Sequence, residues 1–97
     1  MENIGKKVII RGSDSGVEFG ELIEHVGQEV TLKNARRLWY WEGAASLSQL
    51  AVDGTQAPDK CKFTITVPNI TVLDTIEIIP CSIKAIKSIE SVPEWKL

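Results

Sequence analysis

Three strand-like runs fill the first 41 residues and are separated by only a few turn residues. KKVIIRG (6–12) leads through the turn sequence GSDSG into VEFGELIEHVG (17–27), and QEVTLKNARRLWYW (28–41) follows directly. β-Branched residues and turn residues in this order predict strands joined by tight turns. Connections this short join only antiparallel neighbours, because a parallel crossover needs about a dozen residues or more. We therefore expect the chain to begin as a three-stranded antiparallel meander.

The rest of the chain combines helical and strand patterns. EGAASLSQLAVDG (42–54) predicts a helix that stops at Gly54, and TQAPDKC (55–61) predicts a loop. Two further strands are predicted over KFTITVP (62–68) and NITVLDTIEIIP (69–80), and a short amphipathic helix over SIKAIKSIES (82–91) with Ser82 as its N-cap. The order βββαββα predicts an α+β fold, in which a small antiparallel sheet, curled or barrel-like, carries two short helices on one face or end.

Composition limits the classes of protein to which this chain can belong. Its 97 residues predict a single domain, with the 43% hydrophobic and 25% charged content of an ordinary soluble globular protein. A net charge of −2 gives no basic excess, so polymeric nucleic acid is not expected as a partner. The apolar runs are too short for a transmembrane helix or a signal-peptide core, which predicts a cytoplasmic protein without a membrane partner.

Signatures of catalysis and metal binding are weak. Cys61 and Cys81 lie outside any C-x-x-C pair, so we expect two reduced and largely buried thiols, with a disulfide between them as the open alternative. His25 is the only histidine and is interpreted as a solvated hairpin residue. GSDSG could cradle a phosphate with its backbone N–H groups, but an ordinary hairpin turn is the interpretation we favour. We expect no metal, no cofactor and no enzymatic activity.

One stretch is hard to explain by folding alone. Arg36 and Arg37 stand one leucine before Trp39, Tyr40 and Trp41, and these three make up half of the aromatic residues, which are three Trp, one Tyr and two Phe. In a regular strand, alternation would place Val30, Leu32 and Leu38 on a core face, with a bulge expected near Asn34–Ala35. The opposite face would then carry cations beside indoles, as Lys33, Arg37, Trp39 and Trp41.

Three explanations of this stretch stay open. The indoles could pack beneath the following helix, with the arginines stacked on them. The strip could instead be a subunit contact, since Trp, Tyr and Arg are enriched at interface hot spots. In the third explanation, indoles stack on a base while guanidinium groups bind phosphate. Small residues over 43–48 at a helix start favour this one, because a helix N-terminus attracts anions.

The third explanation assigns a role to each candidate residue. Arg36 and Arg37 would bind phosphate, Trp39 and Trp41 would stack on the base, and the hydroxyl groups of the helix start would add hydrogen bonds. Further cations would come from the same and the adjacent strand. The predicted ligand-binding residues are Arg11, Lys33, Arg36, Arg37, Trp39, Trp41, Ser46 and Ser48.

Nearly the whole chain resembles a family of small proteins encoded by tailed bacteriophages. The resemblance rests on residues 8–54, on CKFTITVPNITVLDTIEIIPC (61–81) and on the closing SVPEWK, and its most specific part is ARRLWYWEGAASLSQLA (35–51). It implies a phage protein acting in the cytoplasm of an infected bacterial host, and it implies no assigned activity.

This setting leads to a functional hypothesis by analogy. Small phage proteins without catalytic signatures often act on host defence, and one such class comprises compact homo-oligomers that sequester nucleotide signals. We therefore expect an anti-defence sponge: a homo-oligomer that binds a cyclic oligonucleotide or an ADP-ribose derivative without cleaving it. The alternative is a small phage structural or interaction protein that uses RRLWYW as a protein–protein interface.

Overall fold

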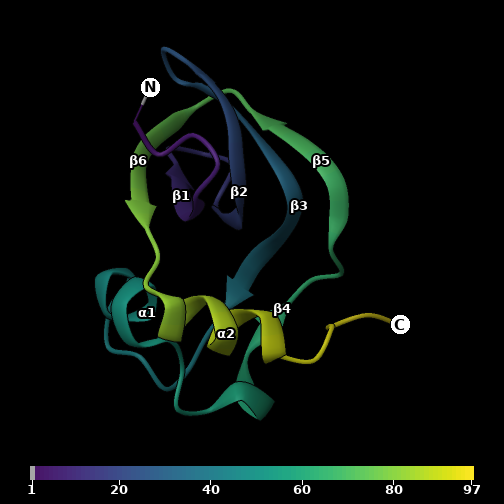
Figure 1. Cartoon of the computed structure of the whole chain (residues 1–97). Helices are drawn as coiled ribbons and strands as arrows, with labels where there is room; N and C mark the ends of the chain where they lie inside the picture. Colours follow the sequence, from purple (N-terminus) through teal and green to yellow (C-terminus); the bar gives the residue numbers. More distant parts are fainter. Residues whose placement is uncertain (1) are drawn as a thin grey trace.

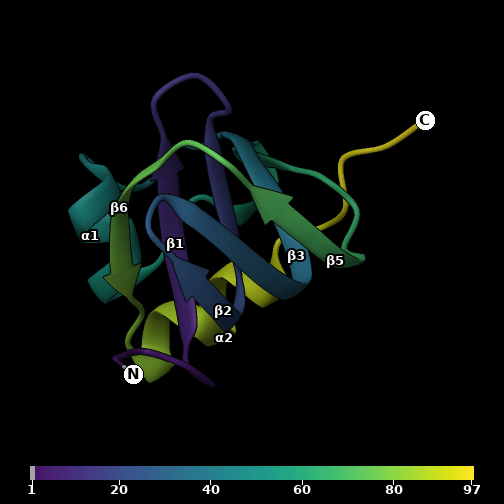
Figure 2. The same ribbon diagram turned by 90° about the horizontal axis from the view of Figure 1, so that it is seen from above.

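A strongly curved antiparallel sheet, with two helices packed against one end, forms the fold in the computed structural model, which describes residues 2–97 (Figures 1 and 2). The helices are α1 (Leu47–Asp53) and α2 (Ile83–Ser91), with a short 3₁₀ turn at Pro58–Lys60. The strands are β1 (Lys7–Gly12), β2 (Val17–Val26), β3 (Glu29–Tyr40), β4 (Lys62–Phe63), β5 (Val67–Val72) and β6 (Thr75–Pro80).

The sheet is built around the predicted meander. β1 pairs antiparallel with β2, and β2 pairs antiparallel with β3. β6 joins the free edge of β1, while β4 and β5 both pair with the outer edge of β3, so that the order is β4-β3-β2-β1-β6 with β5 beside β3. The sheet bends around its own concave face without closing into a barrel (Figure 2). The prediction of an α+β fold with a curled antiparallel sheet is confirmed.

The strands after α1 differ from the prediction. A single strand was expected over residues 69–80, but the chain turns at Leu73–Asp74 and makes β5 and β6 from it. The strand expected over 62–68 is also divided, because β4 ends at Phe63 and β5 already begins at Val67. The reason for the turn at Asp74 lies far away in the sequence. Its Oδ2 accepts hydrogen bonds from the backbone N–H groups of Asp14 and Ser15, at 2.7 and 2.9 Å.

A bulge in β3 changes the face that this strand buries. Phe19 pairs with Arg36 and Glu21 pairs with Lys33, so β3 has one residue more than β2 over this interval, and Asn34 there has a positive φ of 51°. Gly20 lies opposite the bulge, where a Cβ atom would come within 3.1 Å of the Ala35 Cα. The predicted bulge near Asn34–Ala35 is confirmed, and it directs the two halves of β3 toward different cores.

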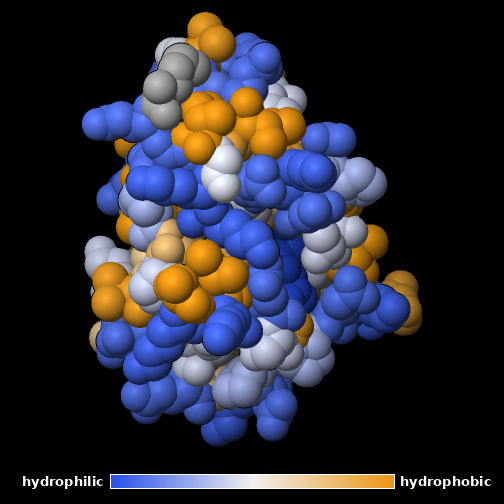
Figure 3. All heavy atoms as spheres, in the orientation of Figure 1, coloured by the Kyte–Doolittle hydropathy of each residue, from blue (hydrophilic) through white to orange (hydrophobic). Residues whose placement is uncertain are grey.

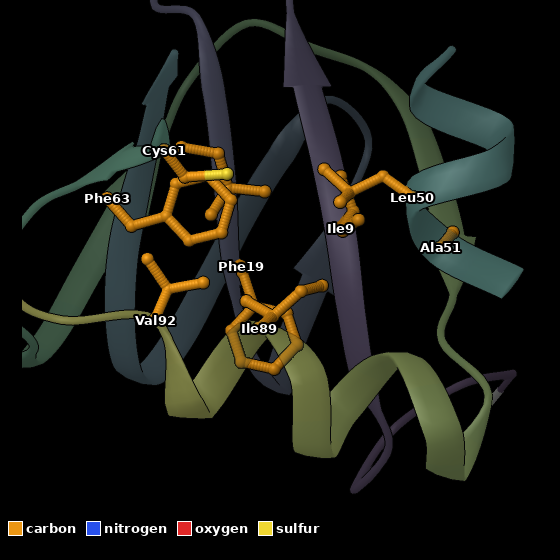
Figure 4. Close-up of a cluster of buried hydrophobic side chains, with 9 residues drawn as sticks. Ile9, Phe19, Leu50, Ala51, Cys61, Phe63, Ile89 and Val92 are labelled. Carbon is orange, nitrogen blue, oxygen red and sulfur yellow. The ribbon is translucent and has the colours of Figure 1, made fainter. Parts of the chain in front are cut away.

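Two hydrophobic clusters stabilise the fold. The cluster between sheet and helices contains Ile9, Phe19, Leu38, Leu50, Ala51, Cys61, Phe63, Ile89 and Val92 (Figure 4). The cluster on the concave side of the sheet contains Val8, Ile10, Leu22, Val30, Leu32, Ala35 and Val72. Because β3 contributes Leu32 to the second cluster and Leu38 to the first, the segment between them crosses from one core to the other.

Local signals position both helices. Ser46 and Ser82 accept hydrogen bonds from Gln49 N and Ala85 N as N-caps, and α1 stops at Gly54 as predicted. Burial along α2 does not follow the three-residue spacing of its isoleucines, since Ile83 is 75% exposed and Ala85 is fully buried. Polar side chains cover most of the surface in Figure 3, and apolar ones gather near the upper end of the sheet and over α1. Within residues 2–97, neither helix has the length and apolarity that crossing a bilayer requires.

Replacing Asp74 with asparagine is expected to lower stability at neutral pH and to flatten its pH dependence in acid. Hydrogen bonds from the Ser15 hydroxyl and the Asp14 backbone lower the pKa of Asp74 from 3.8 to about 2. A depressed folded-state pKa stabilises the fold above the ordinary pKa, and this contribution is lost as the pH falls toward the folded-state value. Thermal melts across this acidic range measure the effect.

The matched control for this prediction is Asp59→Asn, at an exposed aspartate of the 3₁₀ turn. We expect the control to melt like the wild type at every pH. An Asp74→Asn variant with the full acid dependence of the wild type would show that another carboxylate is responsible.

Candidate functional site

Arg36 is buried and links the end of α2 to β4 through hydrogen bonds. The residue is 4% exposed, and its guanidinium lies 5.5 Å from the centre of the Phe63 ring. Its nitrogens donate hydrogen bonds of 3.0–3.1 Å to four backbone carbonyl oxygens, those of Phe63, Thr64, Ile89 and Val92. Burial lowers the pKa of Arg36, and a nearby Glu94 opposes that shift. Arg36 therefore belongs to the core and lies outside the candidate site.

Arg37 points the other way and is held by a buried carboxylate. Its Nε donates a hydrogen bond of 2.6 Å to Glu18 Oε2, while its own side chain is 38% exposed and that of Glu18 only 2%. Burial raises the pKa of Glu18, and the hydrogen bond and charge of Arg37 partly offset that increase. Among residues 2–97, neither terminal Nη group of Arg37 has a partner, so both can donate to a ligand.

The exposed side of Arg37 opens on a pocket of about 330 Å³, which we call the indole pocket. β3 supplies Arg37, Leu38 and Trp39, and Trp41 follows this strand. The β1–β2 turn supplies residues 14–16, and Val17 begins β2. The pocket thus combines a guanidinium, two indoles and one carboxylate, that of Asp14. An aromatic plane can stack on a flat ring of a ligand, and free N–H donors beside it can bind an anion attached to that ring.

An exposed aromatic patch lies beside this pocket. Trp39, 62% exposed, stacks on Trp95 with ring centroids 6.3 Å apart and an interplanar angle of 18°. The segment carrying Trp95 runs along β4, where Trp95 N donates to Phe63 O at 2.8 Å. Lys62 Nζ lies 5.5 Å from the Trp95 ring and 5.9 Å from the Tyr40 ring. Trp95 therefore extends the aromatic surface that RRLWYW begins.

A model of one protein family matches residues 5–89, which is most of the chain. The chain belongs to the DUF6948 family. The description of this family is a domain of unknown function. No curated protein and no solved structure matches the DUF6948 chain.

The remaining predicted site residues of the DUF6948 chain lie apart from the indole pocket. Arg11 Nε donates to Glu77 Oε1 on β6 at 3.0 Å. Lys33 is exposed and lines a different hollow, next to Lys7 and Glu90. Ser46 caps α1, and Ser48 is exposed on its first turn. Of the eight predicted residues, the structure brings together Arg37, Trp39 and Trp41.

Three other features of the DUF6948 chain have structural roles. The GSDSG turn binds a carboxylate of the protein itself, because Asp74 accepts hydrogen bonds from the backbone N–H groups of Asp14 and Ser15. His25 Nε2 lies 2.9 Å from Gly27 O in the β2–β3 hairpin. Both cysteines are free thiols, and burial raises the pKa of Cys81 to about 12, so its thiol stays protonated at neutral pH.

Glu18 and Trp95 are the contributors that the sequence pattern missed. Glu18 shares strand parity with Leu22, which points to the concave core, and an acid at such a position is a signal that alternation can detect. Trp95 gave no comparable signal, since its approach to Trp39 depends on the path of the last residues along β4.

Proposed function

We propose that this chain binds a nucleotide-type ligand in the indole pocket and sequesters it without cleavage, as a phage-encoded homo-oligomeric sponge for a host immune signal. One observation carries the proposal. A buried carboxylate holds Arg37 through Nε, and both Nη groups, which have no partner among residues 2–97, lie beside two indoles. A guanidinium fixed in this way loses little freedom on binding a phosphate, which favours tight binding.

The lining of the pocket fits binding better than hydrolysis. Among the described residues, it includes one acid, Asp14, and neither histidine nor cysteine. General acid–base catalysis usually needs a positioned pair of titratable groups near the reacting atoms. The one acid repels phosphate, so we place the phosphate at Arg37 and the base toward Trp39 and Trp41.

The size of the pocket bears on the class of nucleotide. About 330 Å³ is at the lower end of the roughly 300–1,000 Å³ found for ligand pockets. Such a pocket has room for one nucleotide unit. A cyclic dinucleotide or an ADP-ribose derivative has two units, so it needs a second surface, on the same chain or on another copy.

Native mass spectrometry of the purified protein tests the proposal directly. The protein is measured alone and with cyclic dinucleotides, cyclic trinucleotides and ADP-ribose derivatives. We expect a defined oligomer that retains an intact nucleotide. An oligomer that ignores the whole panel would refute nucleotide binding, and release of a cleaved product would refute sequestration.

Substitutions locate the ligand once one is found. Arg37→Ala should weaken binding at least about tenfold, because hydrogen bonds to charged groups contribute roughly 1.5–3 kcal/mol. Trp39→Ala should weaken it by a similar factor, since a stacked base contributes about 1–3 kcal/mol. Lys33→Ala, which removes an exposed cation outside the pocket, is the matched control and should bind like the wild type. Isothermal titration calorimetry measures all three, and equal affinities for all would refute this location.

A protein interface is the second candidate, favoured by the aromatic patch. Trp39, Tyr40 and Trp95 are 62%, 44% and 47% exposed, and such residues are enriched at interface hot spots. In this alternative the strip binds a protein partner or another subunit. Light scattering then separates the two functions, because Trp39→Ala would dissociate the oligomer in the absence of any nucleotide.

A further inference from the structure

A second pocket lies on the other side of Arg37. This carboxylate pocket has a volume of about 210 Å³, and Arg37 is the one residue that it shares with the indole pocket. Its walls are mostly aliphatic, from Ala35, Ile65, Val67 and Ile70, and Glu18 lines it as well. At less than the roughly 300 Å³ of a complete ligand site, it has room for part of a ligand.

Glu18 gives this pocket an acceptor, Oε1, that has no donor among residues 2–97. Oε2 accepts from Arg37 Nε at 2.6 Å, while no donor among residues 2–97 forms a hydrogen bond with Oε1. The side chain is only 2% exposed, but among residues 2–97 the fully buried side-chain oxygen without a partner is Thr75 Oγ1, so Oε1 of Glu18 still contacts solvent. A carboxylate here costs stability, since burial raises the pKa of Glu18. Titratable groups in such unfavourable surroundings cluster at functional sites.

The chemistry of the pocket selects its ligand group. An ionised carboxylate accepts hydrogen bonds and donates none. Guanine presents two adjacent donors, N1–H and the N2 amino group, to such an acceptor. Adenine and cytosine pair one amino donor with a ring nitrogen that repels a carboxylate, and uracil flanks its single N–H with two carbonyl oxygens. The aliphatic walls suit the faces of a flat base.

We propose that the carboxylate pocket is a second base subsite, in which Glu18 selects guanine. The inference rests on the proposed function: with a phosphate at Arg37, one base lies in the indole pocket and a guanine lies in the carboxylate pocket. Two bases that flank one phosphate are the arrangement of a dinucleotide. The preferred ligand of this chain is thus a guanine-containing dinucleotide.

Calorimetry with cyclic di-GMP, cyclic di-AMP and cyclic GMP–AMP tests the inference. A bidentate contact to a base contributes discrimination of about 5- to 150-fold, so the wild type should prefer the guanine ligands over cyclic di-AMP within that range. Glu18→Gln should reduce this ratio to less than about threefold. Because Glu18 also orients Arg37, the affinity for every ligand should fall in this variant. The ratio isolates the contact to the base.

Two further variants keep the test decisive. Arg37→Lys should weaken all ligands and preserve the ratio, because it removes the planar set of donors to the phosphate but keeps a positive charge beside Glu18. Ile65→Trp, at a position 46% exposed on the pocket wall, should abolish the ratio by filling the pocket while Glu18 and Arg37 remain. Equal wild-type affinity for guanine and adenine ligands would overturn the inference and leave the proposed function standing. The absence of binding to any nucleotide would overturn both.

Discussion

Replacing Arg36 with methionine will lower the free energy of unfolding by about 3–5 kcal/mol, the cost of breaking a buried charged network. The substitution preserves most of the aliphatic volume but removes the donors to four backbone carbonyls. Two of these carbonyls lie at the C-terminal end of α2: that of Ile89 also accepts from Val92 N at 3.3 Å, and that of Val92, the C-cap residue, lies just beyond the helix. Urea denaturation followed by tryptophan fluorescence measures the loss.

Two variants test whether the hydrogen bonds donated by the Arg36 guanidinium account for this loss of stability. Arg36→Lys keeps the charge but replaces a planar five-donor group with one ammonium, so it should recover only a small part of the lost stability. Arg11→Met makes the same change at an arginine whose side chain is 50% exposed in an ion pair with Glu77, and it should cost less than about 1 kcal/mol. If Arg36→Met costs no more than Arg11→Met, the proposed role of Arg36 in the core is wrong.

Replacing Gly54 with alanine will destabilise the protein by about 2–5 kcal/mol, from backbone strain and overpacking together. Gly54 ends α1 with φ 76° and ψ −159°, a region that is essentially restricted to glycine. A Cβ atom there would also collide with Ser88 of α2, whose Oγ would be only 2.5 Å away. Ser88 cannot easily move, because its Oγ accepts a hydrogen bond from Thr55 N at 2.9 Å.

Paired variants separate the strain from the collision. Gly27→Ala, with φ 59° and, among residues 2–97, no atom beyond its chain neighbours within 4 Å of the new Cβ, should cost only about 1–2 kcal/mol. Gly54→Ala combined with Ser88→Gly should cost less than the sum of the two single variants, because the double variant removes the collision and keeps the strain. Denaturant titrations of the single and double variants provide the comparison. A double variant whose loss of stability equals the sum of the losses in Gly54→Ala and Ser88→Gly would show that the collision contributes nothing.

Much of the fold can be predicted from local residue patterns. The short connections of the meander, the caps at Ser82 and Gly54 and the bulge near Asn34 each depend on neighbours in the sequence, so the pattern contains them. The turn at Asp74 was missed because its carboxylate binds a turn that lies about 60 residues earlier. A contact between residues so far apart in the sequence leaves no trace in the local alternation of polar and apolar residues.

The candidate site was only partly predictable for the same reason. Alternation correctly grouped Arg37 with Trp39 and Trp41, which line one pocket. Alternation could not show that Arg36 donates hydrogen bonds to the carbonyl oxygens of Ile89 and Val92, since these acceptors lie 53 and 56 residues away in the sequence. Ser46 and Ser48 are close to Trp41 in sequence, but the chain between them leads to α1 and away from the indole pocket.

The bulge at Asn34 also has a consequence for how this sequence can change over time. In a strand, losing one residue turns every following side chain to the opposite face. Without Asn34, Leu38 and Arg36 would exchange sides with Arg37 and Trp39. The side chains of the site would then point into the core, and those of the core would point into solvent. Insertions in the β2–β3 hairpin turn would have no such effect. Evolution is therefore free to lengthen that turn, whereas the number of residues between Leu32 and Trp39 must be inherited unchanged.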